Sequence, residues 1–415
     1  MSYFHYDQNE LYAENVPLAK IAAQFGTPCF VYSRAAIETQ WEEFDRAFGS
    51  VPHRICYAVK ANSNLAMLNL LAQKNSGFDI VSQGELERVL AAGGDPQKII
   101  FSGVGKQTAE IQFALDNNIG CFNIESEAEL DRLQLLAAQR KKIANIALRI
   151  NPNIDARTHP YIATGLHENK FGIELSESLP LVKKIQGMQN INLIGIACHI
   201  GSQLTELEPF LETADFLVAT AKQFITAGIK LQQINIGGGL GVRYQHEKPP
   251  AIAEYVSALR TKLASCSLEI ILEPGRAIVA NAGVLLTQVE YVKHNKYKNF
   301  AIVDAGMNDL LRPALYGAWH DIIPVKLPDK NLTEKIYDIV GPVCESADFF
   351  AKNRAFSLES GTLLAVCSAG AYGFSMSSNY NSRPRAAEIM IDGDKIHLIR
   401  EREKICDLFS HEFLI

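Results

Sequence analysis

The chain has 415 residues, of which 47% are hydrophobic and 21% charged, a balance ordinary for a globular protein and a length that favours two domains. Its formal net charge of −6, without a basic stripe, gives no support for a nucleic-acid-binding surface. No apolar run approaches the roughly 18 residues of a membrane span, and the polar, acidic segment 1–10 is not a signal peptide. The 8 cysteines form no C-x-x-C pair, so we expect no metal centre, no disulfide framework and a cytoplasmic location.

From residue 55 to residue 276, short apolar runs alternate with helical patterns. Most runs are continuously apolar, as expected for parallel strands that are buried on both faces. The predicted strands are 55–60, 78–82, 98–102, 120–124, 145–151, 192–199, 232–237 and 268–273, and helices are predicted at 64–75, 84–92, 107–117, 126–140 and 250–264. This alternation favours an α/β fold with a (β/α)8 TIM-like barrel. The alternative is a doubly wound open sheet, which only the glycine-rich run at 237–239 supports.

After residue 280 the pattern changes to β-like runs that are separated by turns. The predicted strands are 284–292, 299–304, 335–340 and 363–367, followed by a hairpin at 387–399 around Asp392-Gly393-Asp394. We therefore predict a β-rich C-terminal domain over 281–415 and the barrel over 31–280. Residues 1–30 are predicted to be an N-terminal segment that packs with the β domain.

Lys60 ends the first predicted barrel strand, before the turn Ala61-Asn62-Ser63-Asn64. A lysine in this place has its stem in a core and its amine at a rim, where desolvation disfavours the ammonium form. A neutral amine can attack a carbonyl carbon and form an imine. For a single lysine, the commoner alternative is an amine that simply reaches water.

The loops after the last two predicted barrel strands are suited to an anion. They contain Gly237-Gly238-Gly239 and Glu273-Pro274-Gly275-Arg276. Consecutive glycines let backbone N–H groups approach an anion closely, and Arg276 adds positive charge. Active sites of such barrels lie at the carboxyl ends of the strands, and phosphate sites commonly use these two loops. Together with Lys60 on the same rim, they predict a cofactor that carries an aldehyde and a phosphate, which describes pyridoxal 5'-phosphate.

Glu273, His199 and Ser202 fit the same cofactor. Pyridoxal phosphate acts as an electron sink while its ring nitrogen is protonated, and a carboxylate such as Glu273 beside that nitrogen keeps it so. His199 follows the sixth predicted strand and could lie flat against the ring, and Ser202 could donate to the phosphate. The alternatives are an ion pair between Glu273 and Arg276, a histidine satisfied in the core and a serine that caps a turn.

Several motifs resemble those of fold-type III, alanine-racemase-like pyridoxal-phosphate enzymes, and within them the diaminopimelate decarboxylase family. The cofactor motifs are YAVKAN (57–62), HIGSQ (199–203), GGGLG (237–241), EPGR (273–276) and GAYG (370–373). The segments that resemble the diaminopimelate-specific ones are 158–173, 304–320 and 341–348. The resemblance covers about residues 30 to 385. It departs at Gln83, where the family usually has glycine, so the loop after the second strand is expected to differ slightly in shape.

This resemblance implies a role for each matching residue. Lys60 would form the imine, His199 would stack on the ring and Glu273 would pair with its nitrogen. The residues implied around the phosphate are Ser202, Gly239, Gly275, Arg276 and Tyr372, and those implied to hold the substrate are Arg276, Arg312, Tyr316, Glu345 and Tyr372. Cys344 would be the proton donor, and with Glu345 it would reach the site from the partner subunit of a homodimer.

The implied reaction is decarboxylation of meso-2,6-diaminopimelate at its D-centre, which gives L-lysine and ends bacterial lysine biosynthesis. Arginines such as Arg276 and Arg312 suit planar carboxylates, and Glu345 suits a distal ammonium group. The default alternatives are surface charges for Arg312 and Glu345 and a small buried hydrophobe for Cys344.

Rival functions remain open at the level of the sequence. An amino-acid racemase prefers a ring nitrogen that is not fully protonated, so Glu273 argues against it. Ornithine- or arginine-type decarboxylation differs mainly around Cys344-Glu345. A non-catalytic pyridoxal-phosphate carrier would lack the C-terminal domain, and a lysine-dependent aldolase on the same barrel face would bind no chromophore.

Overall fold

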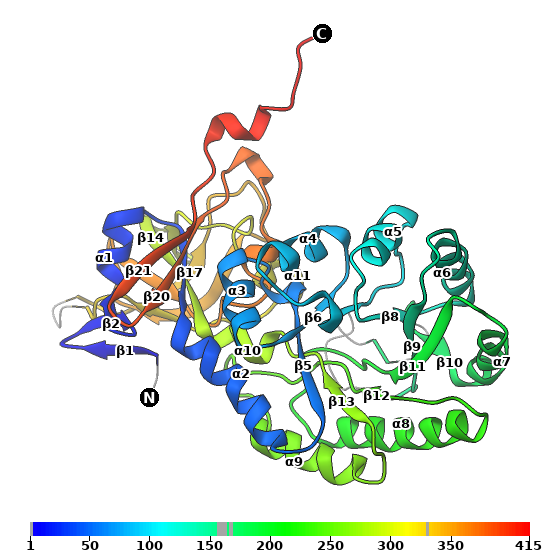
Figure 1. Ribbon diagram of the computed structural model, residues 1–415. Coiled ribbons are helices and arrows are strands. Elements are labelled where there is room, and N and C mark those ends of the chain that lie inside the picture. Colours follow the sequence, from blue (N-terminus) through cyan, green and yellow to red (C-terminus); the bar gives the residue numbers. More distant parts are fainter. Residues whose placement is uncertain (1–2, 156–163, 166–168, 329–331) are drawn as a thin grey trace. The chain divides into compact units, whose positions relative to one another are not determined.

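The computed structural model describes residues 3–155, 164–165, 169–328 and 332–415 (Figure 1). The chain forms two compact units. The barrel unit comprises Gln40–Val242 and Lys248–Ala277, and the β-rich unit comprises Met1–Thr39, Arg243–Glu247 and Ile278–Ile415. Across the described ranges, we find no helix long and apolar enough to cross a membrane.

The barrel unit is a closed ring of parallel strands. Its strands are β5 (His53–Ala58), β6 (Gly77–Ile80), β7 (Ile99–Phe101), β8 (Cys121–Ile124), β9 (Ala144–Asn151), β11 (Ile191–Ala197), β12 (Gln233–Asn235) and β13 (Glu269–Leu272). Each pairs in parallel with the next, and β13 pairs with β5, which closes the ring. The short strand β10 (Ile173–Glu174) pairs in parallel with the last two residues of β9, Ile150 and Asn151. The predicted (β/α)8 barrel is therefore confirmed and the open sheet is wrong.

Helices follow the barrel strands, as the alternating pattern predicts. They are α3 (Leu65–Gln73), α4 (Gln83–Ala91), α5 (Thr108–Asp116), α6 (Glu127–Gln139), α7 (Leu175–Gln186), α8 (Glu208–Thr226) and α9 (Ile252–Leu263). Side-chain oxygens of Asn64, Ser82 and Ser126 cap the N-termini of α3, α4 and α6. Figure 1 shows α8 and α9 side by side. The capping residues lie in the loops that leave the carboxyl ends of the strands.

The β-rich unit is built on a mixed sheet. Its order is β18-β17-β15-β14-β4-β20-β21, and β19 and β16 pair beside β14. The strands are β4 (Cys29–Ser33), β14 (Gly283–His294), β15 (Asn299–Val303), β16 (Ile322–Pro324), β17 (Lys335–Val340), β18 (Phe349–Phe356), β19 (Leu363–Val366), β20 (Ala387–Asp392) and β21 (Lys395–Arg400). Strand β4 pairs with β14 and β20, so the N-terminal segment contributes a central strand of this sheet.

The β-rich unit also contains a small separate sheet, short helices and a buried apolar core. Strands β1 (Phe4–Asp7), β2 (Glu10–Ala13) and β3 (Val16–Pro17) form a separate small sheet. Helices α1 (Leu18–Phe25) and α11 (Arg312–Tyr316) belong to the β-rich unit, whereas α2 (Arg34–Phe48) and α10 (Arg276–Val279) each cross a boundary between the units in sequence. The buried core of the β-rich unit joins residues of β4, β14 and β20, among them Val31, Leu286 and Ile389.

One boundary differs from its prediction in a way that matters for the site. The first barrel strand ends at Ala58, and Lys60 lies in the following 3-10 turn Val59–Ala61. Ala58 is the last residue in register with β6, and its N–H donates to Pro274 O at 3.1 Å. The Tyr57 hydroxyl donates to Asn62 O across the turn at 3.0 Å. The apolar run continues past the strand because Val59 and Ala61 are buried within the turn.

Candidate active site

Lys60 is joined to a buried carboxylate at the rim of the barrel unit. Its Nζ donates to Asp79 Oδ2 at 3.0 Å, and the Asp79 side chain is 0% exposed whereas that of Lys60 is 38% exposed. The expectation that desolvation governs this amine is therefore corrected, because the amine is partly exposed and ion-paired. Asp79 is the third residue of β6 and was not singled out in the sequence. In the sequence, Asp79 stands out as a charged residue within an apolar run.

Glu273 follows β13 directly and is buried. Its Oε1 accepts hydrogen bonds from Asn235 Nδ2 at 2.6 Å and from Asn123 Nδ2 at 3.5 Å. The pKa of Glu273 is raised to about 8, chiefly by burial and also by the nearby Asp79 carboxylate. The Asn235 hydrogen bond and the charges of Lys60 and Arg149 act in the opposite direction. A buried carboxyl with this balance is suited to hold a positive charge beside it.

His199 presents a neutral imidazole at the same end of the barrel. The residue follows β11, and its Nδ1 accepts a hydrogen bond from Gly238 N at 3.1 Å. Burial lowers the pKa of His199 well below its ordinary value, and the charges of Arg149 and Lys60 lower this pKa too. Because Nδ1 accepts a hydrogen bond, the ring proton belongs on Nε2. The side chain therefore offers an uncharged aromatic face.

The glycine turn at 237–239 leaves no room for side chains. Gly237 and Gly239 have φ angles of +77° and +109°, which favour glycine. A Cβ on Gly238 would lie 2.2 Å from Glu273 O, and one on Gly239 would lie 2.6 Å from Gly201 O. The turn is therefore pressed against the loops that follow β11 and β13.

Arg276 and Ser202 lie together in the same unit. Arg276 Nη2 donates to Ser202 Oγ at 2.9 Å, and Arg276 is 7% exposed. Gly275 precedes Arg276, and a Cβ there would lie 3.0 Å from the Cβ of Ala61 and 3.1 Å from that of Ala58. The two loops predicted to bind an anion thus contribute closely packed backbone and the Arg276 guanidinium, and the loop after β11 contributes the Ser202 hydroxyl.

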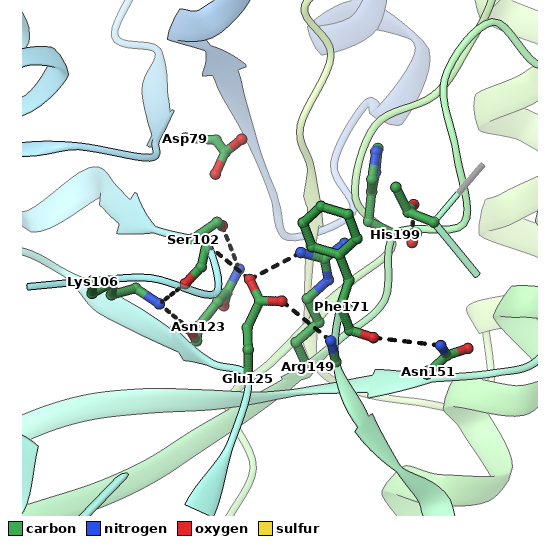
Figure 2. A network of polar contacts seen from close by, with 12 residues as sticks. Asp79, Ser102, Lys106, Asn123, Glu125, Arg149, Asn151, Phe171 and His199 are labelled. Carbon is green, nitrogen blue, oxygen red and sulfur yellow. Dashed lines mark hydrogen bonds and ion pairs between the residues drawn. The ribbon is translucent and has the colours of Figure 1, made fainter. Parts of the chain in front are cut away.

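A buried polar network centred on Glu125, the residue after β8, was given no role from the sequence (Figure 2). Glu125 Oε1 accepts hydrogen bonds from Arg149 Nη1 at 3.0 Å and from Gly103 N at 2.7 Å. Its Oε2 accepts from Gly172 N at 3.2 Å, and the Arg149 guanidinium lies 4.9 Å from the centre of the Phe171 ring. This network joins the loop after β7, the start of α6, strand β9 and β10. Its signal in the sequence is Arg149 in the middle of the apolar run 145–151.

The predicted substrate residues Arg312 and Tyr316 lie on α11 of the β-rich unit. Arg312 is 6% exposed, so the alternative of a surface charge is wrong. Its guanidinium lies 4.4 Å from the centre of the Tyr244 ring, and its Nη1 donates to His320 Nε2 at 2.7 Å. His320 Nδ1 donates in turn to Cys367 O at 2.8 Å. A neutral His320 thus orients Arg312, which is the geometry expected of a carboxylate receptor.

Cys344 and Glu345 lie in a turn between β17 and β18, and both are exposed. The alternative of a buried hydrophobic cysteine is therefore wrong. Asp348 shapes this turn, because its carboxylate accepts from Val343 N and from Met307 N, both at 2.6 Å. Cys344 N donates to Asn381 Oδ1 at 2.9 Å. Tyr380 donates its hydroxyl to Glu345 Oε1 through a short hydrogen bond.

Tyr372 follows β19 and is half-buried with a φ angle of +55°. A left-handed backbone at a bulky residue is uncommon, and such residues cluster at functional sites. Part of the predicted substrate segment 158–173 lies outside the described residues, namely 158–163 and 166–168. Thr164 is described, and its Oγ1 donates to His199 O at 2.8 Å.

The groups present in the barrel unit fit pyridoxal phosphate. An amine, Lys60, suits its aldehyde; a buried carboxylate, Glu273, suits its ring nitrogen; and a neutral imidazole, His199, suits its ring face. The glycine turn and the Arg276–Ser202 pair suit its phosphate. Of the predicted site residues, Lys60, His199, Ser202, Gly239, Glu273, Gly275 and Arg276 lie in the barrel unit, and Arg312, Tyr316, Cys344, Glu345 and Tyr372 lie in the β-rich unit.

Comparison with known proteins agrees with this cofactor chemistry. Residues 34–280 match the family model of the pyridoxal-dependent decarboxylase pyridoxal binding domain. The chain is therefore a member of the pyridoxal-dependent decarboxylases and uses pyridoxal phosphate as its cofactor.

Full-length relatives narrow the family. The chain is 55% identical to the diaminopimelate decarboxylase of Vibrio cholerae and 53% identical to that of Pseudomonas aeruginosa, with 100% of both chains covered in each case. The crystal structure of the Helicobacter pylori diaminopimelate decarboxylase complexed with L-lysine aligns with a TM-score of 0.92 at 44% identity, over 95% of this chain and 99% of that one. The chain belongs to the diaminopimelate decarboxylase family.

Proposed function

We propose that this chain decarboxylates meso-2,6-diaminopimelate at its D-centre and forms L-lysine and carbon dioxide. Membership of the diaminopimelate decarboxylase family supports this substrate. The observation that carries the chemistry is the convergence of Lys60, His199 and Glu273 at the carboxyl ends of the barrel strands. When bound, pyridoxal phosphate supplies an electron sink for the electron pair of the broken carbon–carbon bond.

The barrel unit holds the cofactor in this proposal. Lys60 Nζ would hold the cofactor through its aldehyde, and Asp79 would balance the charge of the free amine. Glu273 keeps a proton at the ring nitrogen, and the neutral His199 ring lies against the cofactor ring. The phosphate is held by Ser202, Gly239, Gly275 and Arg276, with Tyr372 of the β-rich unit also contributing.

The substrate is held by Arg276, Arg312, Tyr316, Glu345 and Tyr372 in this proposal. Two guanidinium groups suit a substrate with two carboxylates, and a carboxylate such as Glu345 suits its distal ammonium group. The orientation of Arg312 by His320 supports its assignment as a carboxylate receptor. Binding both ends of the substrate distinguishes this compound from a monocarboxylate amino acid.

Cys344 donates the proton that replaces the departing carboxylate. The carbon–carbon bond breaks, carbon dioxide leaves without the electron pair, and the Sγ proton of Cys344 goes to the former D-centre, which leaves a thiolate. We propose that the chain is a homodimer and that Cys344 and Glu345 serve the site of the partner subunit. Their exposure on the β-rich unit supports this assignment.

We further propose that the chain works in a reducing, cytoplasmic compartment. This proposal is supported by the eight cysteines, all of which are free. In functional terms, we propose that residues 31–280 bind the cofactor and that residues 281–415, together with the segment 1–30, form the β-rich domain. The pairing of β4 with β14 and β20 supports the association of the N-terminal segment with this domain.

A substrate panel tests the proposed function. The purified protein is incubated with pyridoxal phosphate and, in separate tubes, with meso-diaminopimelate, L-ornithine and L-arginine, and released carbon dioxide and amines are measured. We expect carbon dioxide and L-lysine from meso-diaminopimelate alone. Equal or faster release from L-ornithine or L-arginine would contradict the substrate assignment, and a Lys60→Ala variant controls for catalysis by free cofactor.

A further inference from the structure

Asn235, the last residue of β12, is completely buried beside Glu273. Its Nδ2 donates to Glu273 Oε1 at 2.6 Å, and its Oδ1 accepts from Gly237 N at 2.8 Å. An amide has both a donor and an acceptor and can make these two bonds at once. An ionised aspartate at this position would have no donor for Glu273.

The amide determines which oxygen of Glu273 is engaged. Within the described ranges, the two side-chain donors that reach this carboxylate, Asn235 and Asn123, both bind Oε1. The Asn123 bond is long at 3.5 Å, and the same Nδ2 also donates to Ser102 Oγ at 3.0 Å. Asn235 is therefore the stronger contact, and Oε2 is left for the ring nitrogen of the cofactor.

Asn235 also links Glu273 to the turn that holds His199. Gly237 N donates to Asn235, Gly238 N donates to His199 Nδ1, and Glu273 N donates to Gly237 O at 2.8 Å. Asn235 thus connects Glu273, the group proposed for the ring nitrogen, with the glycine turn that contacts His199, the group proposed for the ring face.

The charge state of Glu273 depends on this contact. Burial and the Asp79 carboxylate favour the neutral acid, whereas the Asn235 hydrogen bond and the charges of Lys60 and Arg149 favour the carboxylate. A neutral Glu273 would not keep the ring nitrogen protonated. Loss of the hydrogen bond to the charged form would therefore weaken the electron sink.

We propose that Asn235 is a positioning residue that turns Glu273 toward the cofactor ring, stabilises its carboxylate form beside the ring nitrogen, and fixes the glycine turn against Glu273. The proposal rests on the proposed function only through the contact between Glu273 and the ring nitrogen.

The first test is Asn235→Ala in the holoenzyme. Nuclear magnetic resonance of a cofactor with an isotopically labelled ring nitrogen reports protonation without substrate. We expect the labelled nitrogen to shift toward the unprotonated form at neutral pH. With meso-diaminopimelate, kcat is expected to fall about 10- to 100-fold with KM nearly unchanged, as when an outer partner of a site ligand is lost.

The second test is Asn235→Asp, which replaces the amide by a titratable group of the same shape. The protonated acid can donate to Glu273 as the amide does, whereas the ionised form repels it. We expect ring-nitrogen protonation and kcat near those of wild type at acidic pH, and loss of both through an additional ionisation as the pH rises. A purely structural role would not produce this pH-dependent rescue.

Asn192→Asp is the matched control, because it makes the same substitution at an exposed residue near the start of strand β11. It should behave as wild type throughout. A wild-type ring-nitrogen signal and a wild-type kcat in Asn235→Ala would overturn the proposal. A pH profile of Asn235→Asp without the additional ionisation would overturn it too. If Asn235→Ala does not fold, the pH profile of Asn235→Asp is sufficient to decide. Failure of wild type to act on meso-diaminopimelate, with the ring-nitrogen signal still dependent on Asn235, would overturn only the proposed substrate.

Discussion

At the scale of single residues, the candidate site of the barrel unit contains interacting charged groups, Lys60, Asp79 and Glu273, of which the two acids are buried. Lys60 pairs with Asp79, whose side chain is fully buried, and the charges of both residues act on Glu273. In the proposed function, Lys60 would hold the cofactor and Glu273 would hold the positive charge of its ring nitrogen. Burial of Glu273 is unfavourable without that charge, which couples the stability of the unit to cofactor binding.

The pH dependence of the cofactor-free protein tests this balance. The pKa of Glu273 is raised from 4.5 to about 8. An acid with a raised pKa binds its proton more tightly in the folded chain, so its contribution to stability is complete below about pH 4.5 and is lost as the pH rises through about 8. The variant Glu273→Gln stays neutral. We expect the Tm of cofactor-free Glu273→Gln to rise relative to that of wild type between about pH 5 and pH 8, and a constant difference would contradict the account.

Cys344 allows a second test at the residue scale. A serine hydroxyl is a far weaker acid than a thiol, so Cys344→Ser should bind cofactor normally, with unchanged absorbance, while kcat falls about 100-fold or more. Cys406→Ser is the control, because Cys406 is also exposed in the β-rich unit. An unimpaired Cys344→Ser variant would remove this residue from the role of proton donor.

At the scale of elements, the barrel strands combine an apolar core with buried polar side chains. The inner core contains Cys56, Ile100, Cys121, Ala147, Ile194, Ala197 and Ile271. Toward the carboxyl ends of the strands this core gives way to Asp79, Asn123, Arg149 and Asn235, all of them buried. The Glu125–Arg149 pair then connects strand β9 to the backbone at Gly103 and Gly172.

Removal of one partner of this pair should destabilise the barrel unit. Glu125→Gln leaves the buried Arg149 without its countercharge and weakens the bonds from Gly103 and Gly172. Breaking a buried ion pair in this way costs about 3–5 kcal/mol of unfolding free energy, which urea denaturation would measure. Glu127→Gln is the control, because Glu127 pairs with Lys184 at the surface and little change is expected. Equal effects of the two substitutions would contradict the structural role of Glu125.

At the scale of the whole molecule, the sequence predicts the architecture better than the contacts of the site. The eight barrel strands are recognisable because most of them are continuous apolar runs that alternate with helical patterns, and the strands of the β-rich unit because turns separate them. The ends of strands are less predictable, since Val59 is apolar and buried whether it lies in a strand or in a turn.

The candidate site shows the same division. Lys60, Glu273 and the glycine turn could be found because they follow strands of a barrel. Asp79 and Asn235 could not be assigned partners, because their hydrogen bonds reach the side chains of Lys60 and Glu273, 19 and 38 residues away, on the neighbouring barrel strand or just after it. Both nevertheless stand as polar residues in apolar strands, which is the signal that could have found them.

The proposed homodimer is testable by mixing two inactive variants. Lys60→Ala lacks the cofactor amine and Cys344→Ala lacks the proton donor. If each site takes Lys60 from one subunit and Cys344 from its partner, random reassociation of equal amounts restores one intact site in each mixed dimer, which gives about a quarter of wild-type activity. Absence of any recovery, with mixed dimers shown to form, would contradict the shared site.

The most direct test of the central claim is turnover of meso-diaminopimelate in deuterium oxide by the holoenzyme, with the product analysed by mass spectrometry and nuclear magnetic resonance. Decarboxylation at the D-centre, followed by protonation from an exchangeable group such as the Cys344 thiol, predicts L-lysine with a single deuterium on its terminal carbon, bonded to the side-chain amine. Deuterium on the α-carbon, formation of D-lysine, or recovery of labelled diaminopimelate without carbon dioxide would contradict the account.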